Sequence, residues 1–455
     1  MSENTLQLLL DVRKARQQGP AAIKQRQRKR LAEMVAYARA NSPYYRELYK
    51  GLPERVEDPT LLPVTNKKKL MARFDEWVTD REVTLEKARP FVENPDLFGS
   101  GKQLLDKYFV ITTSGTTGTH GLFLIDKRSL SVITPLALTM LSAWLGPRDI
   151  LRIIAGGGRI ASILATGTPL ASGVGIARIR QRLGKAFREL SVFSPLPELV
   201  SELNEFQPLV LMSYGTMTKL LANEQEAGRL HIKPVLILIT AEGLPPNEYE
   251  HIARVFGTKV GNSYAASECP FISYSCEYGW LRVNSDWVLL EPVDADYRPV
   301  PPGVQSHTVL ISNLANRVQP ILRYDLGDSI LQRPDQCPCG THLPVIRVQG
   351  RAADMLIFPT DHGERITVPP LLFGASIYHI PGIEQFQLVQ TTPTNLRVRL
   401  KLASHADPDH AWQAVHTELT RLLSRRKLDH VTVERAEEPP EQSPGGKYRE
   451  VIPLS

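Results

Sequence analysis

The sequence has few cysteines and no long apolar run. Four cysteines in 455 residues are too sparse for a disulfide framework, which agrees with a reducing compartment and leaves metal binding open. No apolar run approaches the about 20 residues that a membrane-spanning helix needs, and no small-residue cleavage site follows the short leucine cluster near the start. We therefore expect a cytoplasmic protein that has no membrane partner.

Internal repeats and low-complexity tracts are also absent. The 54 Lys and Arg residues exceed the 48 Asp and Glu residues by six, and much of this excess lies between residues 12 and 40. Such a stretch fits either a solvated helix face or a basic arm for nucleic acid. Because it lacks stacking aromatic residues and a recognised binding motif, we expect the helix face and no nucleic-acid partner.

The pattern of apolar residues indicates two domains with different architectures. A chain of this length, 42% hydrophobic and 22% charged, exceeds the usual size of one domain. A helical pattern covers residues 24–49, and Asn66 is a predicted N-cap because a lysine-rich helical pattern follows it. Apolar, β-branched runs then predict strands at residues 107–112, 150–155, 209–213, 235–240, 287–293, 307–312 and 320–324.

The pattern of apolar and polar residues changes near Gly350. Two alternating runs, 383–390 and 396–404, predict a hairpin, and residues 407–427 predict an amphipathic helix with acids first and bases last. We therefore expect an α/β fold: a large N-terminal domain of mixed sheets and helices, residues 1–348, and a small mobile α+β domain, residues 349–455.

A glycine-rich loop lies between two short apolar runs at residues 109–125. Inward-facing N–H groups, helped by Ser and Thr hydroxyls, make such a loop suited to phosphate oxygens. It is not a Walker loop, because it has no lysine and a strand-like run follows it. A mobile hairpin turn is the alternative, but two residues suffice for a turn and extra glycine costs backbone entropy. We expect phosphate binding.

This loop resembles the phosphate loop of the acyl-adenylate-forming (ANL) superfamily. Further motifs of that superfamily follow in order: GNSYAASE (Gly261–Glu268), RYDLGD (Arg323–Asp328), GRAADM (Gly350–Met355) and SPGGKYRE (Ser443–Glu450). The N-terminal region and the CPCG stretch are similar to the phenylacetate-CoA ligase branch. The resemblance implies an AMP-forming acid ligase that uses ATP and Mg²⁺ to make an acyl-adenylate and then a thioester with CoA.

The resemblance assigns the phosphates and the metal to two motifs. The triphosphate would be held by the loop residues Thr113, Ser114, Gly115, Thr116, Thr117, Gly118 and Thr119. Thr117 is also a catalytic candidate. Glu268 would offer Mg²⁺ a hard carboxylate oxygen and act in catalysis, and Ser267 would contact the α-phosphate.

The nucleoside would be held by other residues of the same motifs. By resemblance, Ala241 and Glu242 lie in the segment that closes over the adenine, and Tyr264 stacks on that base. Asp328 would accept both ribose hydroxyls, a task suited to a carboxylate with two oxygens, and Arg351 would assist.

Lys447 follows a pair of glycines close to the end of the chain. Taken alone, such a lysine fits a solvated tail. Beside the other four motifs, the resemblance makes Lys447 the principal catalytic residue, whose ammonium would stabilise charge as the carboxylate attacks the α-phosphorus.

The acid and the final acceptor are less constrained by the sequence. The pocket residues implied by the resemblance, Tyr214, Ala241, Ala265 and Phe271, are neutral, which favours an aromatic or apolar carboxylic acid. The hinge motif departs from its usual pattern at Ala353, so a carrier protein, an amine or another nucleophile could replace CoA, and the activated oxyanion need not be a carboxylate. A nucleotide-binding adaptor with vestigial motifs and a homodimer also stay open.

Three cysteines form a second group of candidate site residues. Cys276, Cys337 and Cys339 resemble the zinc-binding cysteines of part of the phenylacetate branch, with His342 as a candidate fourth ligand. The alternative is that buried thiols pack as small apolar groups. Any zinc here would be structural, since the chemistry asks only for Mg²⁺.

Overall fold

The computed structural model describes residues 5–94, 102–113, 121–164, 179–351, 354–360, 365–368, 370–377, 380–404, 406–441 and 449–454. Its helices are α1 (Thr5–Gln18), α2 (Pro20–Asn41), α3 (Pro43–Leu48), α4 (Lys67–Ala72), α5 (Phe74–Trp77), α6 (Leu85–Ala88), α7 (Pro90–Glu93), α9 (Lys127–Trp144), α10 (Pro147–Ala155), α12 (Leu196–Phe206), α13 (Gly215–Glu226), α14 (Pro246–Phe256), α15 (Pro370–Ile377) and α16 (Pro408–Ser424). Short 3-10 turns lie at Pro59–Leu61 and Gly184–Ala186.

The strands form five sheets. They are β1 (Phe109–Thr112), β2 (Leu122–Ile125), β3 (Ile160–Leu164), β4 (Phe187–Ser191), β5 (Val210–Ser213), β6 (Leu236–Thr240), β7 (Lys259–Ala266), β8 (Cys269–Ser275), β9 (Leu281–Val283), β10 (Val288–Val293), β11 (Thr308–Asn313), β12 (Ile321–Asp325), β13 (Asp328–Gln332), β14 (Val345–Arg351), β15 (Leu356–Pro359), β16 (Arg365–Val368), β17 (Ile383–Thr392), β18 (Asn395–Leu402), β19 (Thr432–Arg435) and β20 (Val451–Ile452).

The largest sheet changes from parallel to antiparallel at β7. Its nine strands run in the order β13-β14-β9-β8-β7-β6-β5-β3-β4. Strands β3 to β7 pair in parallel, whereas β8, β9, β14 and β13 pair antiparallel. Because parallel strands point the same way, β5, β6 and β7 end at one edge, which is where ligands bind in open α/β sheets. The mixed α/β class expected from the sequence is confirmed.

Two local predictions are wrong. The run at residues 150–155 was expected as a strand but belongs to helix α10. Pro147 at the first helical turn and the Asp149 carboxylate, which accepts from the Gly146 N–H at 2.9 Å, start a helix there. The helix expected over residues 24–49 is divided at Ser42, whose hydroxyl accepts from the Tyr45 N–H and caps α3.

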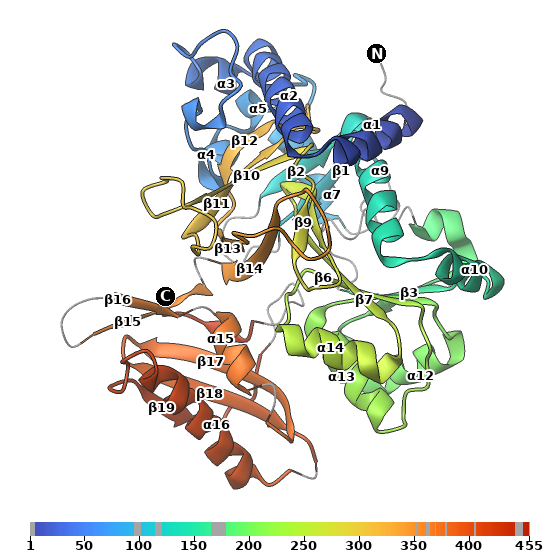
Figure 1. Cartoon of the computed structure of the whole chain (residues 1–455), viewed down its shortest axis with the longest axis vertical. Coiled ribbons are helices and arrows are strands. Elements are labelled where there is room, and N and C mark those ends of the chain that lie inside the picture. Colours follow the sequence, from blue (N-terminus) through green and yellow to red (C-terminus); the bar gives the residue numbers. More distant parts are fainter. Residues whose placement is uncertain are drawn as a thin grey trace.

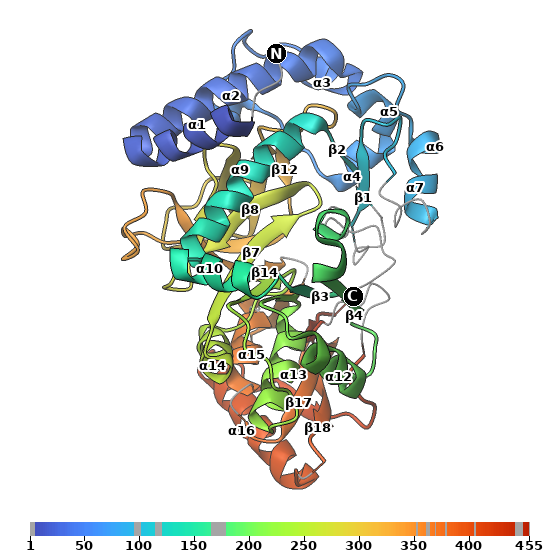
Figure 2. The ribbon, with the colours of Figure 1, turned by 90° about the vertical axis from the view of Figure 1, so that its right-hand side faces the viewer.

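The basic N-terminal helices pack on the large domain, at the end of the molecule opposite the C-terminal elements (Figure 2). Arg30 donates to the Asp11 carboxylate and to the Asp286 carbonyl, both at 2.6 Å, and its guanidinium lies 3.6 Å from the centre of the Trp287 ring. Arg16 donates to Asn284 at 3.1 Å. Part of the basic excess therefore serves contacts within the chain.

The C-terminal elements have a core of their own. Figure 1 shows β15 to β19, α15 and α16 gathered at one end of the molecule. The four strands β19-β18-β17-β20 form one sheet, and the buried apolar cluster around Val415 and Leu419 contains only residues from Leu356 onward. The boundary predicted between residues 348 and 349 falls within β14.

Within the described residues, no single helix is long and apolar enough to cross a membrane. Helices α9 and α10 meet the length and composition criteria only when they are taken together, and they are bent by 103° relative to each other.

Candidate active site

A single large cleft lies where the predicted site residues converge. It has a volume of about 1380 Å³ and lies at the carboxyl ends of β5, β6 and β7, with β14 and the C-terminal residues on its other side. Eleven of the predicted residues line it: Thr113, Tyr214, Ala241, Glu242, Tyr264, Ala265, Ser267, Glu268, Cys276, Asp328 and Arg351. Phe271 does not line it and packs instead in the main core of the large domain. The predicted residues Ser114–Thr119 and Lys447 lie outside the described residues.

Both ends of the glycine-rich loop are fixed by hydrogen bonds. The Thr113 N–H donates to the Gly121 carbonyl at 3.0 Å, and the Gly121 N–H donates to the Thr113 hydroxyl at 2.9 Å. The Ser267 hydroxyl donates to the Thr112 carbonyl at 3.0 Å. The loop that was predicted to bind phosphate is thus tied at its base to the segment that carries Glu268.

Asp328 is held by two partners from different strands. The Tyr264 hydroxyl donates to its Oδ2 at 2.6 Å, and the Arg351 Nε lies 3.4 Å from its Oδ1. Asp328 and Arg351 are also directly opposite each other on β13 and β14. Burial, and then the charge of Asp328, raises the pKa of Tyr264 well above its usual value, so its hydroxyl stays a donor. These contacts fix the carboxylate that was predicted to bind the ribose.

Glu268 is buried and its carboxylate is oriented by Tyr324. The Tyr324 hydroxyl donates to Oε1 at 2.8 Å, and the Asn313 side chain donates to the Glu268 backbone carbonyl at 3.1 Å. Burial and the charge of Glu268 raise the pKa of Tyr324. A carboxylate oxygen held in place at the wall of a large cleft is a ligand that Mg²⁺ accepts. The predicted metal ligand therefore has suitable surroundings.

Lys67 was missed by the sequence interpretation and reaches the same place. It is the first residue of α4, whose N-terminus is capped by Asn66 as predicted. Burial lowers the pKa of Lys67, the charge of Glu268 acts in the opposite direction, and Arg351 lowers it further. A Cβ on Gly121 would lie 3.4 Å from the Lys67 Cδ. Lys67 therefore lies close to Gly121 and within electrostatic reach of Glu268, although it does not itself line the cleft.

The segment after β6 has an unusual backbone. Ala241 has φ of 63°, a left-handed conformation that is uncommon for alanine. The next residue, Glu242, accepts from the Thr216 N–H at 3.0 Å and from its hydroxyl at 2.8 Å. The strained turn thus places the Ala241 backbone along the cleft while Glu242 fixes it to α13.

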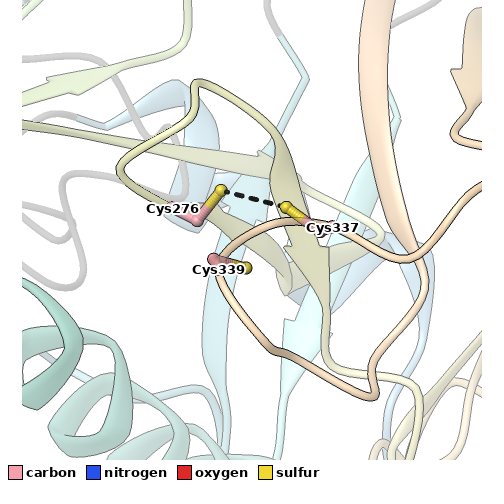
Figure 3. Close-up of side chains that lie close together, drawn as sticks. All are labelled: Cys276, Cys337 and Cys339. Carbon is pink, nitrogen blue, oxygen red and sulfur yellow. Dashed lines mark hydrogen bonds between the residues drawn. The ribbon is translucent and has the colours of Figure 1, made fainter.

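Three cysteines meet beside the cleft, as Figure 3 shows. The sulfurs of Cys276 and Cys337 are 3.8 Å apart, and those of Cys276, Cys337 and Cys339 all lie within 4.8 Å of one another. A tetrahedron with metal–sulfur bonds of about 2.3 Å has edges of about 3.8 Å, so three zinc ligands fit. His342 is exposed and is not part of this cluster, so the candidate fourth ligand from the sequence is not brought to it.

The chain is similar to two known proteins over nearly all of its length. No protein-family model matches the chain. The chain is 25% identical to phenylacetate-coenzyme A ligase from Thermus thermophilus, over 94% of this chain and 96% of that protein. Over nearly its whole length the chain is similar to a phenylacetate-CoA ligase. It is also 22% identical to protein CapK from Staphylococcus aureus, over 94% of this chain and 88% of that protein. The resemblance read from the motifs is thereby confirmed.

Solved structures share the fold of this chain. A 2-hydroxyisobutyryl-CoA ligase in the postadenylation state, in complex with R3-HIB-AMP, superposes with a TM-score of 0.64 at 20% identity, covering 95% of this chain and 89% of that one. The same ligase in the thioesterification state gives a TM-score of 0.53.

Proposed function

We propose that the protein joins a carboxylic acid to AMP at the expense of ATP and then transfers the acyl group to CoA. The observation that carries this proposal is the convergence of Thr113, Glu268 and Asp328 on one cleft. They come from three separate motifs, and each has the chemistry that its motif requires. Relatives whose names include CoA ligase activity and adenylate complexes support the same reaction type.

The first half-reaction is mainly a problem of charge. A carboxylate is already ionised at neutral pH, so it needs no general base, but it must approach a negatively charged phosphorus. Lys67 and Arg351 bring positive charge to the cleft, and the Asp328–Tyr264 pair would orient the ribose. Glu268 would hold Mg²⁺, which when bound neutralises phosphate charge.

An aromatic or apolar acid suits the part of the cleft near α9 and α13. Trp144, Tyr214 and Leu244 line it there, and Ala265 leaves space beside them. Apolar lining with a few polar groups is typical of a pocket that selects its ligand by shape.

Pyrophosphate exchange into ATP tests the first half-reaction. A panel of aryl, acyl and amino acids should contain at least one acid that drives exchange in the wild type. With that acid, Lys447→Ala should lower exchange by about 10²-fold or more while ATP binding persists. Full exchange in the variant would contradict the role of Lys447, and exchange with none of the acids would contradict the proposed reaction.

Adding CoA tests the second half-reaction. We expect the acid that drives exchange to appear as a CoA thioester. Release of AMP without thioester, or transfer only to a carrier protein or an amine, would contradict CoA as the acceptor and leave the adenylation step in place.

A further inference from the structure

Three arginines lie in the part of the cleft beside the cysteines. Arg282 on β9 and Arg347 on β14 line the cleft, and Arg333 follows β13. Val345 pairs with Arg282 on one side, and on the other its carbonyl accepts from the Arg333 N–H at 3.0 Å. Because side chains alternate along a strand, Arg347 is on the same face as Val345. The three arginines therefore share one face of the sheet.

Two of these guanidinium groups lie against the Trp280 ring. Those of Arg333 and Arg347 are 5.2 and 4.3 Å from its centre. Among the described residues, neither arginine forms an ion pair, and the Nε of each is buried without a hydrogen-bond partner. Burial lowers the pKa of Arg347, the charge of Arg333 lowers it further, and Cys276 acts in the opposite direction. Two like charges thus share one aromatic ring, and no described carboxylate neutralises them.

Arg282 differs from the other two because it has an acidic partner. Its guanidinium donates to the Glu277 carboxylate at 3.0 Å. The Glu277 side chain is 61% exposed, so this ion pair contributes little free energy and is readily exchanged for another anion. The three arginines together carry more positive charge than this one acid balances. Because uncompensated charge out of water costs free energy, such a cluster in a cleft fits a bound anion, and guanidinium groups suit phosphate.

An exposed aromatic ring lies in the turn that leads to Trp280. Tyr278 is 51% exposed and lines the same cleft. The turn is closed at its base by the Cys276 N–H, which donates to the Trp280 carbonyl at 2.8 Å. A large ring held in solvent at the wall of a cleft offers a surface on which a nucleobase stacks. Cations suited to phosphate and a ring suited to a base are thus combined along one stretch of the cleft.

This stretch is separate from the residues expected to hold the ribose of ATP. Arg347 precedes Arg351 by four residues on β14, which is about 13 Å along a strand. Arg351 is the residue that contacts Asp328. CoA carries its phosphates and its adenine at the far end of a pantetheine arm. Its nucleotide therefore needs a site away from the adenylate, within the same cleft.

We propose that Arg347, Arg282 and Tyr278 form the subsite for the phosphorylated nucleotide end of CoA, with the guanidinium groups on its phosphates and the tyrosine ring on its adenine. Arg333 adds to the positive potential. The inference rests on the proposed function for the identity of the ligand, and on the arginine cluster alone for the binding of an anion. A zinc ion held by three thiolates would carry one negative charge and would offset part of the arginine charge, so the test separates binding from that counter-ion role.

Binding of adenosine 3′,5′-bisphosphate, which lacks the pantetheine arm of CoA, tests the subsite directly. Calorimetry with saturating AMP, which fills the proposed adenylate site, should show binding to the wild type. Arg347→Gln should weaken this binding by about tenfold or more, because a charged donor to phosphate is lost. Arg347→Lys, which keeps the charge without the planar fork, should weaken it less. Arg298→Gln changes an exposed arginine that does not line the cleft and should bind as the wild type does.

Tyr278→Ala gives a second variant, at an exposed position where folding is not at stake, and should also weaken binding by about tenfold. Wild-type binding no tighter than that of Arg347→Gln would overturn the proposal. So would unchanged binding in Tyr278→Ala together with an Arg347→Gln variant that changes only in zinc content, because the arginines would then be counter-ions of the cysteine cluster.

The thioester assay separates this inference from the proposed function. If CoA is the acceptor, Arg347→Gln should raise the KM for CoA by about tenfold relative to the KM for ATP. Thioester formation with an unchanged KM for CoA would overturn the subsite and leave the proposed reaction in place. Arginine-dependent binding of the bisphosphate without any thioester would instead overturn CoA as the acceptor and leave an anion subsite.

Discussion

Lys67 and Glu268 are brought together from opposite ends of the large domain. Lys67 begins a short N-terminal helix, whereas Glu268 follows the last parallel strand of the main sheet. The lysine is half-buried and its pKa is lowered by burial, so its charge costs free energy in the empty cleft. A triphosphate placed at the adjacent loop would supply the opposite charge. Lys67 and Glu268 are therefore expected to contribute more to ligand binding and catalysis than to the stability of the fold.

Replacing Lys67 should affect chemistry more than folding. We expect Lys67→Met to lower the rate of pyrophosphate exchange by about 10²-fold, because one donor to the developing charge is lost. Thermal unfolding should change little. Lys68→Met, at the neighbouring exposed position, is the matched control and should keep the wild-type rate. Equal rates for both variants would remove Lys67 from the site.

The contrast between Glu268 and Lys67 shows what could be predicted from single residues. Glu268, Asp328 and Arg351 stand in motifs that, taken together and in order, resemble those of the acyl-adenylate-forming superfamily, and this resemblance predicted their convergence on a cleft. Lys67 lies near residues remote in sequence, and nothing in its neighbouring residues marks it as a site residue. Lys67 had one weak signal, the cap at Asn66, which predicted where its helix begins but not what that helix faces.

At the scale of elements, β7 joins the nucleotide-binding residues to the packing of the sheet. Gly261 on β7 lies against Trp144 at the end of α9, and the Trp144 indole N–H donates to the Ser275 carbonyl at 2.8 Å. A Cβ at Gly261 would be 2.8 Å from the indole ring. The first residue of the GNSYAASE motif is therefore small because a fixed tryptophan covers it.

Adding one methyl group at this contact should be costly. We expect Gly261→Ala to lower the free energy of unfolding by about 1–3 kcal/mol, since the ring or the strand must move. Gly243→Ala is the matched control, because nothing lies within 4 Å of its added Cβ, and it should stay within about 0.5 kcal/mol of the wild type. Urea unfolding measures both. A Gly261→Ala variant as stable as Gly243→Ala would mean that Trp144 is free to shift.

The cysteine cluster joins β8 to the connection between β13 and β14. If it holds structural zinc, as we propose, metal analysis of the purified protein should find about one zinc per chain. Cys337→Ala should lose the metal and unfold at lower temperature, because metal binding contributes to folding. Cys269→Ala removes a buried cysteine outside the cluster and should keep the zinc. A wild-type protein free of zinc would leave three thiols that pack as apolar groups.

Helix α10 is an element whose type the sequence pattern did not predict correctly. Residues 150–155 have the composition of a buried strand, yet Ile150, Leu151 and Ile154 are 46%, 65% and 68% exposed on a helix. Length and composition could not separate the two, and the decisive signals were Pro147 and Asp149 at its start. The C-terminal hairpin and helix were predicted correctly because their alternation and end charges are unambiguous.

At the scale of the whole molecule, separate cores divide the chain. The cluster around Leu203 and Leu221 packs α12 to α14 on the parallel strands, and the cluster around Leu419 packs α16 on the C-terminal sheet. Among the described residues, no buried apolar cluster contains residues from both domains. The domains should therefore respond separately to a defect in one core.

Matched cavities in the two cores test this independence. Leu419→Ala and Leu203→Ala each remove a fully buried leucine, at an expected cost of about 2–5 kcal/mol. Hydrogen exchange measured by mass spectrometry should become faster in β17, β18 and α16 for the first variant only. For the second, it should become faster in β5, β6 and α12 only. Faster exchange throughout both domains in either variant would show a single cooperative unit.

The pairing of Asp328 with Arg351 on β13 and β14 bears on the proposed two-step reaction. Asp328 opens β13, and its partner Arg351 is the last residue of β14 before the chain crosses to the small domain. If the small domain rotates about a point after Arg351, the Asp328–Arg351 pair stays with the large domain. If Asp328 binds the ribose, as the resemblance implies, the ribose of an acyl-adenylate would keep this contact while the small domain changes position.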